Sequence, residues 1–201
     1  MESTEVHRDD EGARLGMWIF IFTEILLFGG LFLVYAVMRH AYSDDFHRSA
    51  HELNAFIGAI NTAVLLLSSM TVAMSITAVQ KGETKKAMVL LVITLVCALV
   101  FLINKYFEWG HKIHLHLYPG SDLMLTLRHG SVLFFSLYFF MTGLHMLHLI
   151  VGAIILTIAL KRIMSGRINA GNHVFLENGG LYWHLVDLVW IFLFPLLYLI
   201  T

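Results

Sequence analysis

The chain has 201 residues, of which 58% are hydrophobic and only 13% are charged, and its formal net charge is −1. Soluble domains carry about twice that share of charged residues, so this composition excludes a soluble domain and indicates an integral membrane protein. A net charge near zero predicts no nucleic-acid partner.

Five apolar segments are each long enough to cross a bilayer as a helix, since a span needs about 20 residues. The expected fold class is therefore all-α: a polytopic membrane protein with a bundle of five transmembrane helices. Residues 1–14 are expected to form a cytoplasmic N-terminal segment, and residues 15–201 a single five-helix membrane domain. Little polar sequence remains outside the spans, which are 15–38, 57–79, 87–109, 131–160 and 181–200.

The lysines and arginines predict the orientation, because basic loops stay in the cytoplasm. An N-terminus inside gives more basic residues on the inner face than on the outer face, and the loop 81–86 is the clearest indication. The inner segments then carry Arg8, Arg14, Lys81, Lys85, Lys86, Lys161, Arg162 and Arg167, and the outer segments carry Arg39, Arg48, Lys105, Lys112 and Arg128.

Glu24 lies in the middle of the first span and is the only charged side chain between Leu15 and Met38. A carboxylate at the bilayer centre costs at least about 2.5–3.5 kcal/mol on insertion scales, so it usually faces the bundle interior, pairs or binds a proton. Two interpretations are open. Glu24 is a protonated acid hydrogen-bonded to a neighbouring helix, or it handles protons or gates another subunit.

The second span presents small and hydroxylic side chains on one helical face, which favours close helix packing. Ser68, Thr71 and Ser75 form this face, and the glycines of the first and fourth spans invite the same interpretation; these are Gly29, Gly30, Gly143 and Gly152.

The third span ends in the polar sequence NKYFEWGHK, which is followed by a histidine-rich loop. Glu108 and Lys112 are spaced i,i+4, so an ion pair or a water contact near the interface is expected for Glu108. His111, His114 and His116 are close enough in sequence to suggest a metal site. No cysteine or evident carboxylate completes a zinc-like set, and no metal site is expected.

The fourth and fifth spans carry further polar groups. His145 and His148 share one face at i,i+3, and both need partners inside the membrane. Only His184 adds an imidazole from another span, too few for a haem–copper centre, so hydrogen-bonded histidines are expected instead. Asp187 is a second costly acid, and His184 is its nearest plausible partner. Trp183 fits an interfacial aromatic belt, and Pro195 is expected to disturb the last turns.

Five blocks of sequence, in order along the chain, resemble subunit III of haem–copper oxidases in its five-helix form, most like that of cytochrome c oxidase. The blocks are TEILLFGGLF (23–32), INTAVLLLSS (60–69), KYFEW (105–109), FMTGLHMLHLIVG (140–152) and ENGGLYWHLVDLVWIFLFPLLY (177–198).

This resemblance implies an accessory, non-redox subunit of a proton-pumping oxidase that reduces oxygen to water in aerobic respiration. Such a subunit packs against subunit I, supports assembly, lipid binding, proton uptake and sustained turnover, and binds neither haem nor copper itself. The resemblance also implies partners in membrane lipids and further contact with subunit II, in the inner membrane of a bacterial cell. The N-terminus would be cytoplasmic and the C-terminus outside.

The resemblance assigns roles to individual positions. Glu24 falls on the carbodiimide-reactive intramembrane glutamate of the family, and Glu177 falls on its last-helix motif. The proton-related candidates are Glu24, Asp187, His184, His145, His148 and Glu108, and the lipid-binding candidates are Arg162, Arg167 and Trp183.

Three alternatives stay open: a quinol oxidase subunit III, an accessory protein of nitric oxide reductase, and an independent proton channel. No residue of this chain identifies the electron donor.

Overall fold

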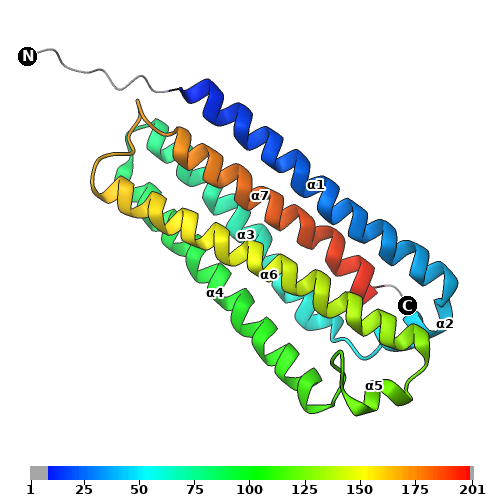
Figure 1. Cartoon of the computed structure of the whole chain (residues 1–201). Coiled ribbons are helices and arrows are strands. Elements are labelled where there is room, and N and C mark those ends of the chain that lie inside the picture. The colour runs from blue at the N-terminus through cyan, green and yellow to red at the C-terminus, as the bar shows by residue number, and fades with distance from the viewer. Residues whose placement is uncertain (1–8, 200–201) are drawn as a thin grey trace, which may run out of the picture.

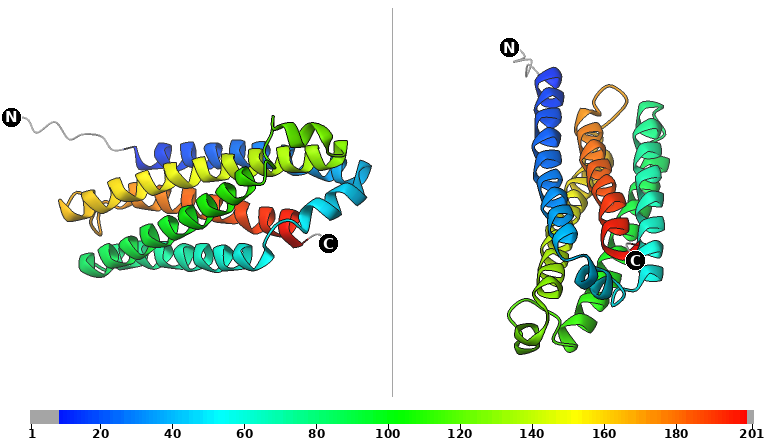
Figure 2. Two further views of the ribbon diagram at one scale, coloured as in Figure 1. Left: turned by 90° about the horizontal axis from the view of Figure 1, so that it is seen from below. Right: turned by 90° about the vertical axis from the view of Figure 1, so that its right-hand side faces the viewer.

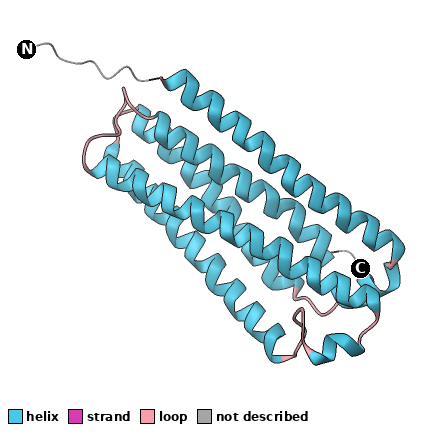
Figure 3. Ribbon diagram, in the orientation of Figure 1, coloured by secondary structure: helices cyan, strands magenta, loops and turns pink. Residues whose placement is uncertain are grey.

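The computed structural model describes residues 9–199, and every named element within them is a helix (Figure 3). The expected N-terminal segment thus lies partly outside the described residues, as does the end of the fifth span. The long helices are α1 (Asp10–Ala41), α3 (Ala55–Gln80), α4 (Thr84–His114), α6 (His129–Met164) and α7 (Val174–Phe194); the short elements are α2 (Ser43–Ala50), α5 (Asp122–Thr126) and the π-helix η1 (Pro195–Leu199).

The five long helices lie side by side, and each is long and apolar enough to cross a membrane (Figure 1). The all-α fold class with five spans is therefore confirmed. α1 begins at the end of the bundle that carries the α3–α4 turn, and η1 finishes at the opposite end (Figure 1). Because α2 and α5 also lie at that opposite end, it is called the α2 end below.

Helix boundaries follow from local capping. Asp9 accepts a hydrogen bond from Gly12 N at 2.7 Å before α1, and Asn54 accepts from Ile57 N at 3.2 Å before α3. Gly82 follows α3 with φ of 78°, a left-handed conformation that favours glycine and lets the chain reverse into α4.

The short helix α2 is not foreseen from the sequence, because only long apolar runs give a strong signal. Its apolar side is buried, and Phe46 packs edge-on against Tyr35 of α1 and Phe134 of α6, with ring centroids 5.4 and 5.5 Å apart. α2 therefore closes the bundle at this end.

α7 is the most buried of the five long helices and α1 the least. Figure 2 shows α7 between α1 and α3 in its right-hand view. The hydroxyl face of α3 is buried, as its expected packing role requires: Ser68 accepts a hydrogen bond from Trp183 Nε1 of α7 at 3.0 Å, and Thr71 Oγ1 lies 2.7 Å from Thr94 Oγ1 of α4. Elsewhere on α3, Thr62 accepts a hydrogen bond from Trp190 Nε1 at 3.0 Å.

The glycines divide into two kinds. A Cβ at Gly152 would lie 2.9 Å from the Trp183 ring, so this glycine permits close approach of α6 and α7. A Cβ at Gly29 or Gly30 would meet nothing within 4 Å, so the packing role expected for these two is wrong within this chain.

Pro195 disturbs the last turns, as predicted. α7 ends at Phe194, and the chain continues as the wider turns of η1. Proline lacks the backbone N–H that would continue the α-helical ladder. Tyr35 of α1 donates to the Leu196 carbonyl at 2.5 Å and fastens η1 to α1.

Candidate functional site

Glu24 and His148 contact each other across α1 and α6. Glu24 Oε2 lies 3.0 Å from His148 Nε2, and each side chain is 14% exposed. The other ring nitrogen, Nδ1, lies 2.8 Å from the Leu144 carbonyl oxygen one turn earlier. Phe28 covers the imidazole edge-on, with ring centroids 5.2 Å apart. The costly acid of the first span therefore has a specific partner.

This geometry fixes how many protons the pair holds. A carbonyl oxygen only accepts, so His148 Nδ1 carries a hydrogen, and in the neutral ring Nε2 is then an acceptor. A hydrogen bond between Nε2 and Glu24 needs one further proton between them. The pair is therefore either a neutral acid with a neutral imidazole, or a carboxylate with an imidazolium, and its net charge is zero in both forms.

A second polar cluster joins α4, α6 and η1. Lys105 Nζ lies 3.2 Å from Glu108 Oε2, and it donates to the hydroxyls of Tyr138 at 3.2 Å and Tyr198 at 2.8 Å. Both tyrosines in turn donate to Glu108 Oε1, at 2.7 and 2.5 Å respectively. The ammonium also lies 5.3 Å from the centre of the Trp190 ring. This buried ion pair is thus surrounded by hydrogen bonds and aromatic rings, the conditions under which burial of two charges is tolerated.

The structure corrects the expected surroundings of Glu108. Its predicted partner, Lys112, donates instead to the Glu52 carbonyl in the α2–α3 connection. Lys105, placed in an outer segment by the sequence reasoning, is fully buried. Its i,i+3 spacing to Glu108 within the third span is the signal that would have revealed it.

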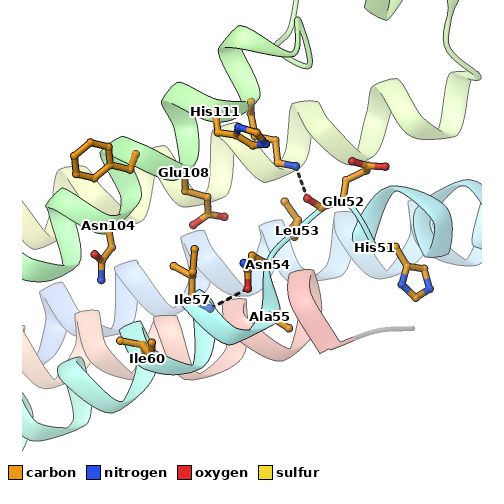
Figure 4. Close-up of a pocket in the computed structure, with 12 residues that line it drawn as sticks. His51, Glu52, Leu53, Asn54, Ala55, Ile57, Ile60, Asn104, Glu108 and His111 are labelled. Carbon is orange, nitrogen blue, oxygen red and sulfur yellow. Dashed lines mark hydrogen bonds between the residues drawn. The ribbon is translucent and has the colours of Figure 1, made fainter.

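A cavity of about 750 Å³ lies beside this cluster at the α2 end, between α3 and α4. Figure 4 shows Glu108, Asn104 and His111 of α4 facing residues of α3 and of the α2–α3 connection. Asn104 Nδ2 donates to Asn61 Oδ1 at 2.7 Å. Glu108 lines the cavity and is 8% exposed, whereas its partner Lys105 has no exposed surface.

The expected pairing of Asp187 with His184 does not form. His184 Nδ1 lies 2.6 Å from Ser69 Oγ on α3, so its ring turns towards α3. Asp187 is 2% exposed, and neither of its oxygens has a hydrogen-bond partner among the described residues. An ionised carboxylate in such a place is expensive, so this group requires a proton or a buried water.

His145 and Trp183 also differ from expectation. His145 is fully buried, and both ring nitrogens lack a hydrogen-bond partner in the described chain, so the predicted hydrogen bonding holds for His148 and not for His145. The His145 ring packs against Phe101 and Trp190, with centroids 5.5 and 5.2 Å apart.

Trp183 has no exposed surface, so the expectation that it faces lipid is corrected. Its indole packs inside the bundle because its N–H finds a hydroxyl there.

Two groups lie at the end opposite α2. Arg162 and Arg167 are exposed at the end of α6, and the Arg162 guanidinium lies 4.1 Å from the centre of the Phe175 ring. Glu177 joins three elements: it pairs with Arg14 of α1 at 2.8 Å and accepts from Gln80 of α3 at 3.2 Å. The last-helix glutamate is thus a structural tie between α1, α3 and α7.

Among residues 9–199, no three or more His, Cys, Asp or Glu side chains gather in a group that could hold a metal ion. The fold thus defines a polytopic, all-α integral membrane protein in which Glu24 pairs with His148 and Lys105 pairs with Glu108 inside the bundle.

Comparison with known proteins identifies its family. The family model described as cytochrome c oxidase subunit III matches residues 3–201, and the chain belongs to this family. The resemblance seen in the five sequence blocks is therefore confirmed.

Individual relatives agree with this assignment. The chain is 30% identical to cytochrome c oxidase subunit 3 of Thermostichus vulcanus, over 97% of this chain and 90% of that protein. It is also 30% identical to a probable quinol oxidase subunit 3 of Staphylococcus saprophyticus, over 93% of this chain and 88% of that protein. A heme-copper oxidase subunit I+III of Aeropyrum pernix is 31% identical over 93% of this chain and 22% of that protein. The chain spans only 66% of the relatives from Allomyces macrogynus and Lemur catta.

Proposed function

We propose that this chain is the accessory subunit III of a haem–copper terminal oxidase, most like cytochrome c oxidase, which reduces oxygen to water and pumps protons in aerobic respiration. The observation that carries this proposal is the family match over residues 3–201. Relatives named as subunit 3 of cytochrome c and quinol oxidases support it.

In this proposal the chain does not hold the catalytic centre, and haem and copper reside in partner subunits. The buried charged groups support this proposal, because they pair with each other and so stabilise the bundle: Lys105 pairs with Glu108, and Glu24 pairs with His148. The Glu24–His148 pair is the group best suited to exchange a proton, since it already shares one between two partly exposed side chains.

Subunit I is the proposed main partner, with subunit II as a further contact. The relative whose name combines subunits I and III supports this, because subunits fused in one chain are held at high effective concentration. The exposed apolar side chains of α1, such as Leu15, Phe22 and Leu26, offer surface for lipid or a neighbouring subunit. Membrane phospholipid is the proposed ligand of Arg162 and Arg167.

The proposed membrane is the inner membrane of a bacterial cell, with the N-terminus in the cytoplasm. The burial of Lys105 and Lys112 supports this orientation. Both lysines lie inside the bundle, so they are no longer counted among the basic residues of the outer loops. The α2 end then keeps Arg39, Arg48 and Arg128, and faces the outside.

Purification through an affinity tag on this chain tests the assignment. We expect subunit I to co-purify with the chain, with haem and copper in that complex. The chain purified alone should contain neither. Stoichiometric haem or copper in the isolated chain would overturn the accessory role.

A quinol oxidase is the second candidate, supported by the relative from Staphylococcus saprophyticus. Haem spectra and donor assays of the purified complex separate the two oxidases, and co-purification with a nitric oxide reductase would point to the third possibility. An independent proton channel requires proton flux from vesicles that contain only this chain, and the absence of flux would exclude it.

A further inference from the structure

Two histidines on α2 present their ring nitrogens to each other. His47 lies in the last turn of α2 and His51 directly follows it, four residues later. Their Nε2 atoms are 3.4 Å apart, and their ring centroids are 4.8 Å apart with the planes nearly perpendicular. Both residues are exposed, and Figure 4 shows His51 beside the cavity on the chain that leaves α2.

This separation suits a shared metal ion. Zn–N bonds to histidine are about 2.05 Å long, so two nitrogens 3.4 Å apart subtend about 110° at the ion, close to the tetrahedral angle. Histidines at i and i+4 lie on one face of a helix, the spacing that helical zinc sites use. Both rings are on the surface, so small rotations can aim both lone pairs at one ion.

We propose that His47 and His51 form a two-histidine site for a divalent transition metal ion, with Zn²⁺ and Cu²⁺ as the matching ions. No third His, Cys, Asp or Glu completes a group around them within residues 9–199, so the remaining coordination positions are open to water. The site is independent of the oxidase assignment, because its geometry lies within α2 and its C-terminal residue.

The other histidines at this end supply a matched comparison. His40 closes α1 and His114 closes α4, and both are exposed like the pair. Removal of these two lowers the number of outer imidazoles equally but leaves the 3.4 Å pair intact.

The test uses the full chain in detergent, titrated with Cu²⁺ and examined by electron paramagnetic resonance, and with Zn²⁺ by calorimetry. We expect one equivalent of Cu²⁺ with two coordinated imidazole nitrogens in the unaltered chain and in the His40→Ala/His114→Ala variant. His47→Ala and His51→Ala should each weaken Zn²⁺ affinity by at least about tenfold, and the double variant should lose the two-nitrogen signal.

Circular dichroism of the double variant verifies that its helices persist. Unchanged affinity in His47→Ala/His51→Ala would overturn the proposal. A single-nitrogen Cu²⁺ spectrum in the unaltered chain, or an equal loss in the control variant, would overturn it as well.

Discussion

A single proton shared by Glu24 and His148 is the main residue-scale consequence of the structure. The His148 Nδ1 contact with a carbonyl oxygen fixes one hydrogen, and the 3.0 Å contact to Glu24 requires another. Either proton position keeps the pair neutral. A neutral pair is far less costly inside a bilayer than a lone carboxylate, which explains how the first span tolerates an acid.

Glu24→Gln should leave assembly and initial turnover nearly intact. The glutamine amide can donate to His148 Nε2 and preserve the hydrogen bond, so we expect a stability change within about 1 kcal/mol. Carbodiimide labelling should disappear, and activity should decay faster over many turnovers. Thermal unfolding and long turnover assays of the purified complex measure both effects.

Glu24→Leu is the matched comparison. Leucine leaves His148 Nε2 without a partner, and a buried unsatisfied group costs about 1–3 kcal/mol. Failure of the glutamine variant to assemble would show that Glu24 is structural.

Lys105→Met should destabilise the chain strongly. It leaves the Glu108 carboxylate buried beside two tyrosine hydroxyls without its cation, and loss of one partner of a buried ion pair costs about 3–5 kcal/mol. The midpoint of thermal unfolding in detergent measures this loss.

The variant Lys105→Met/Glu108→Gln should recover part of that loss, because it removes both charges together. Residues in one such network couple by about 0.5–3 kcal/mol in double-mutant cycles. Additive effects of the two single changes would contradict a coupled pair.

At the scale of helices, close packing of α6 and α7 depends on Gly152. Gly152→Ala places a methyl group 2.9 Å from the rigid Trp183 indole, which cannot move without losing its hydrogen bond to Ser68. Overpacking of this kind costs about 1–3 kcal/mol. We expect a lower unfolding temperature in detergent.

Gly29→Ala is the control for this prediction. Its Cβ would meet nothing within 4 Å, and alanine is the better helix former by about 1 kcal/mol. Equal gains in stability in the two variants would mean that helix propensity decides the outcome, and not the contact of residue 152 with Trp183.

The long helices are predictable from the sequence, whereas most of their contacts are not. Runs of about 20 apolar residues identify all five spans, because the bilayer sets their length. α2 has eight residues and mixed polarity, and its position depends on the packing of Phe46 against distant rings. Local patterns carry no information about such contacts.

The candidate site shows the same division. Their positions inside apolar spans identify Glu24 and His148 as groups that need partners. The two residues are 124 positions apart in the sequence, and only the packing of α1 on α6 brings them together. The local spacing of His184 and Asp187 suggested a pair, and the tertiary contact with Ser69 prevails instead. The buried pairing of Lys105 is predictable from the sequence, since a lysine inside a predicted span requires a partner.

At the scale of the whole molecule, several charged groups are paired inside the bundle, whereas others are exposed at its ends. Glu24, Lys105 and Glu108 are paired within the bundle, whereas Arg162 in the last turn of α6 and Arg167 after that helix are exposed. The apolar flanks of α1 and α4 stay exposed in the isolated chain, and an exposed apolar surface of this extent requires lipid or protein around it. Arg162 and Arg167 are exposed and cationic, so they remain the proposed ligands of phospholipid.

Arg162→Ala/Arg167→Ala should lower the amount of anionic phospholipid that stays bound through purification. Each basic residue near a membrane surface contributes about 1 kcal/mol to anionic lipid binding, and guanidinium forks suit phosphate oxygens. The Phe175 ring packs against the Arg162 guanidinium and holds it in place. Loss of Arg162 should therefore lower lipid binding more than the loss of another exposed positive charge. Lys81→Ala/Lys85→Ala removes two exposed charges from the same end and serves as the control. Mass spectrometry of co-purified lipid measures the outcome: a loss confined to the arginine variant supports a defined lipid site, and unchanged or equal lipid content in both variants refutes it.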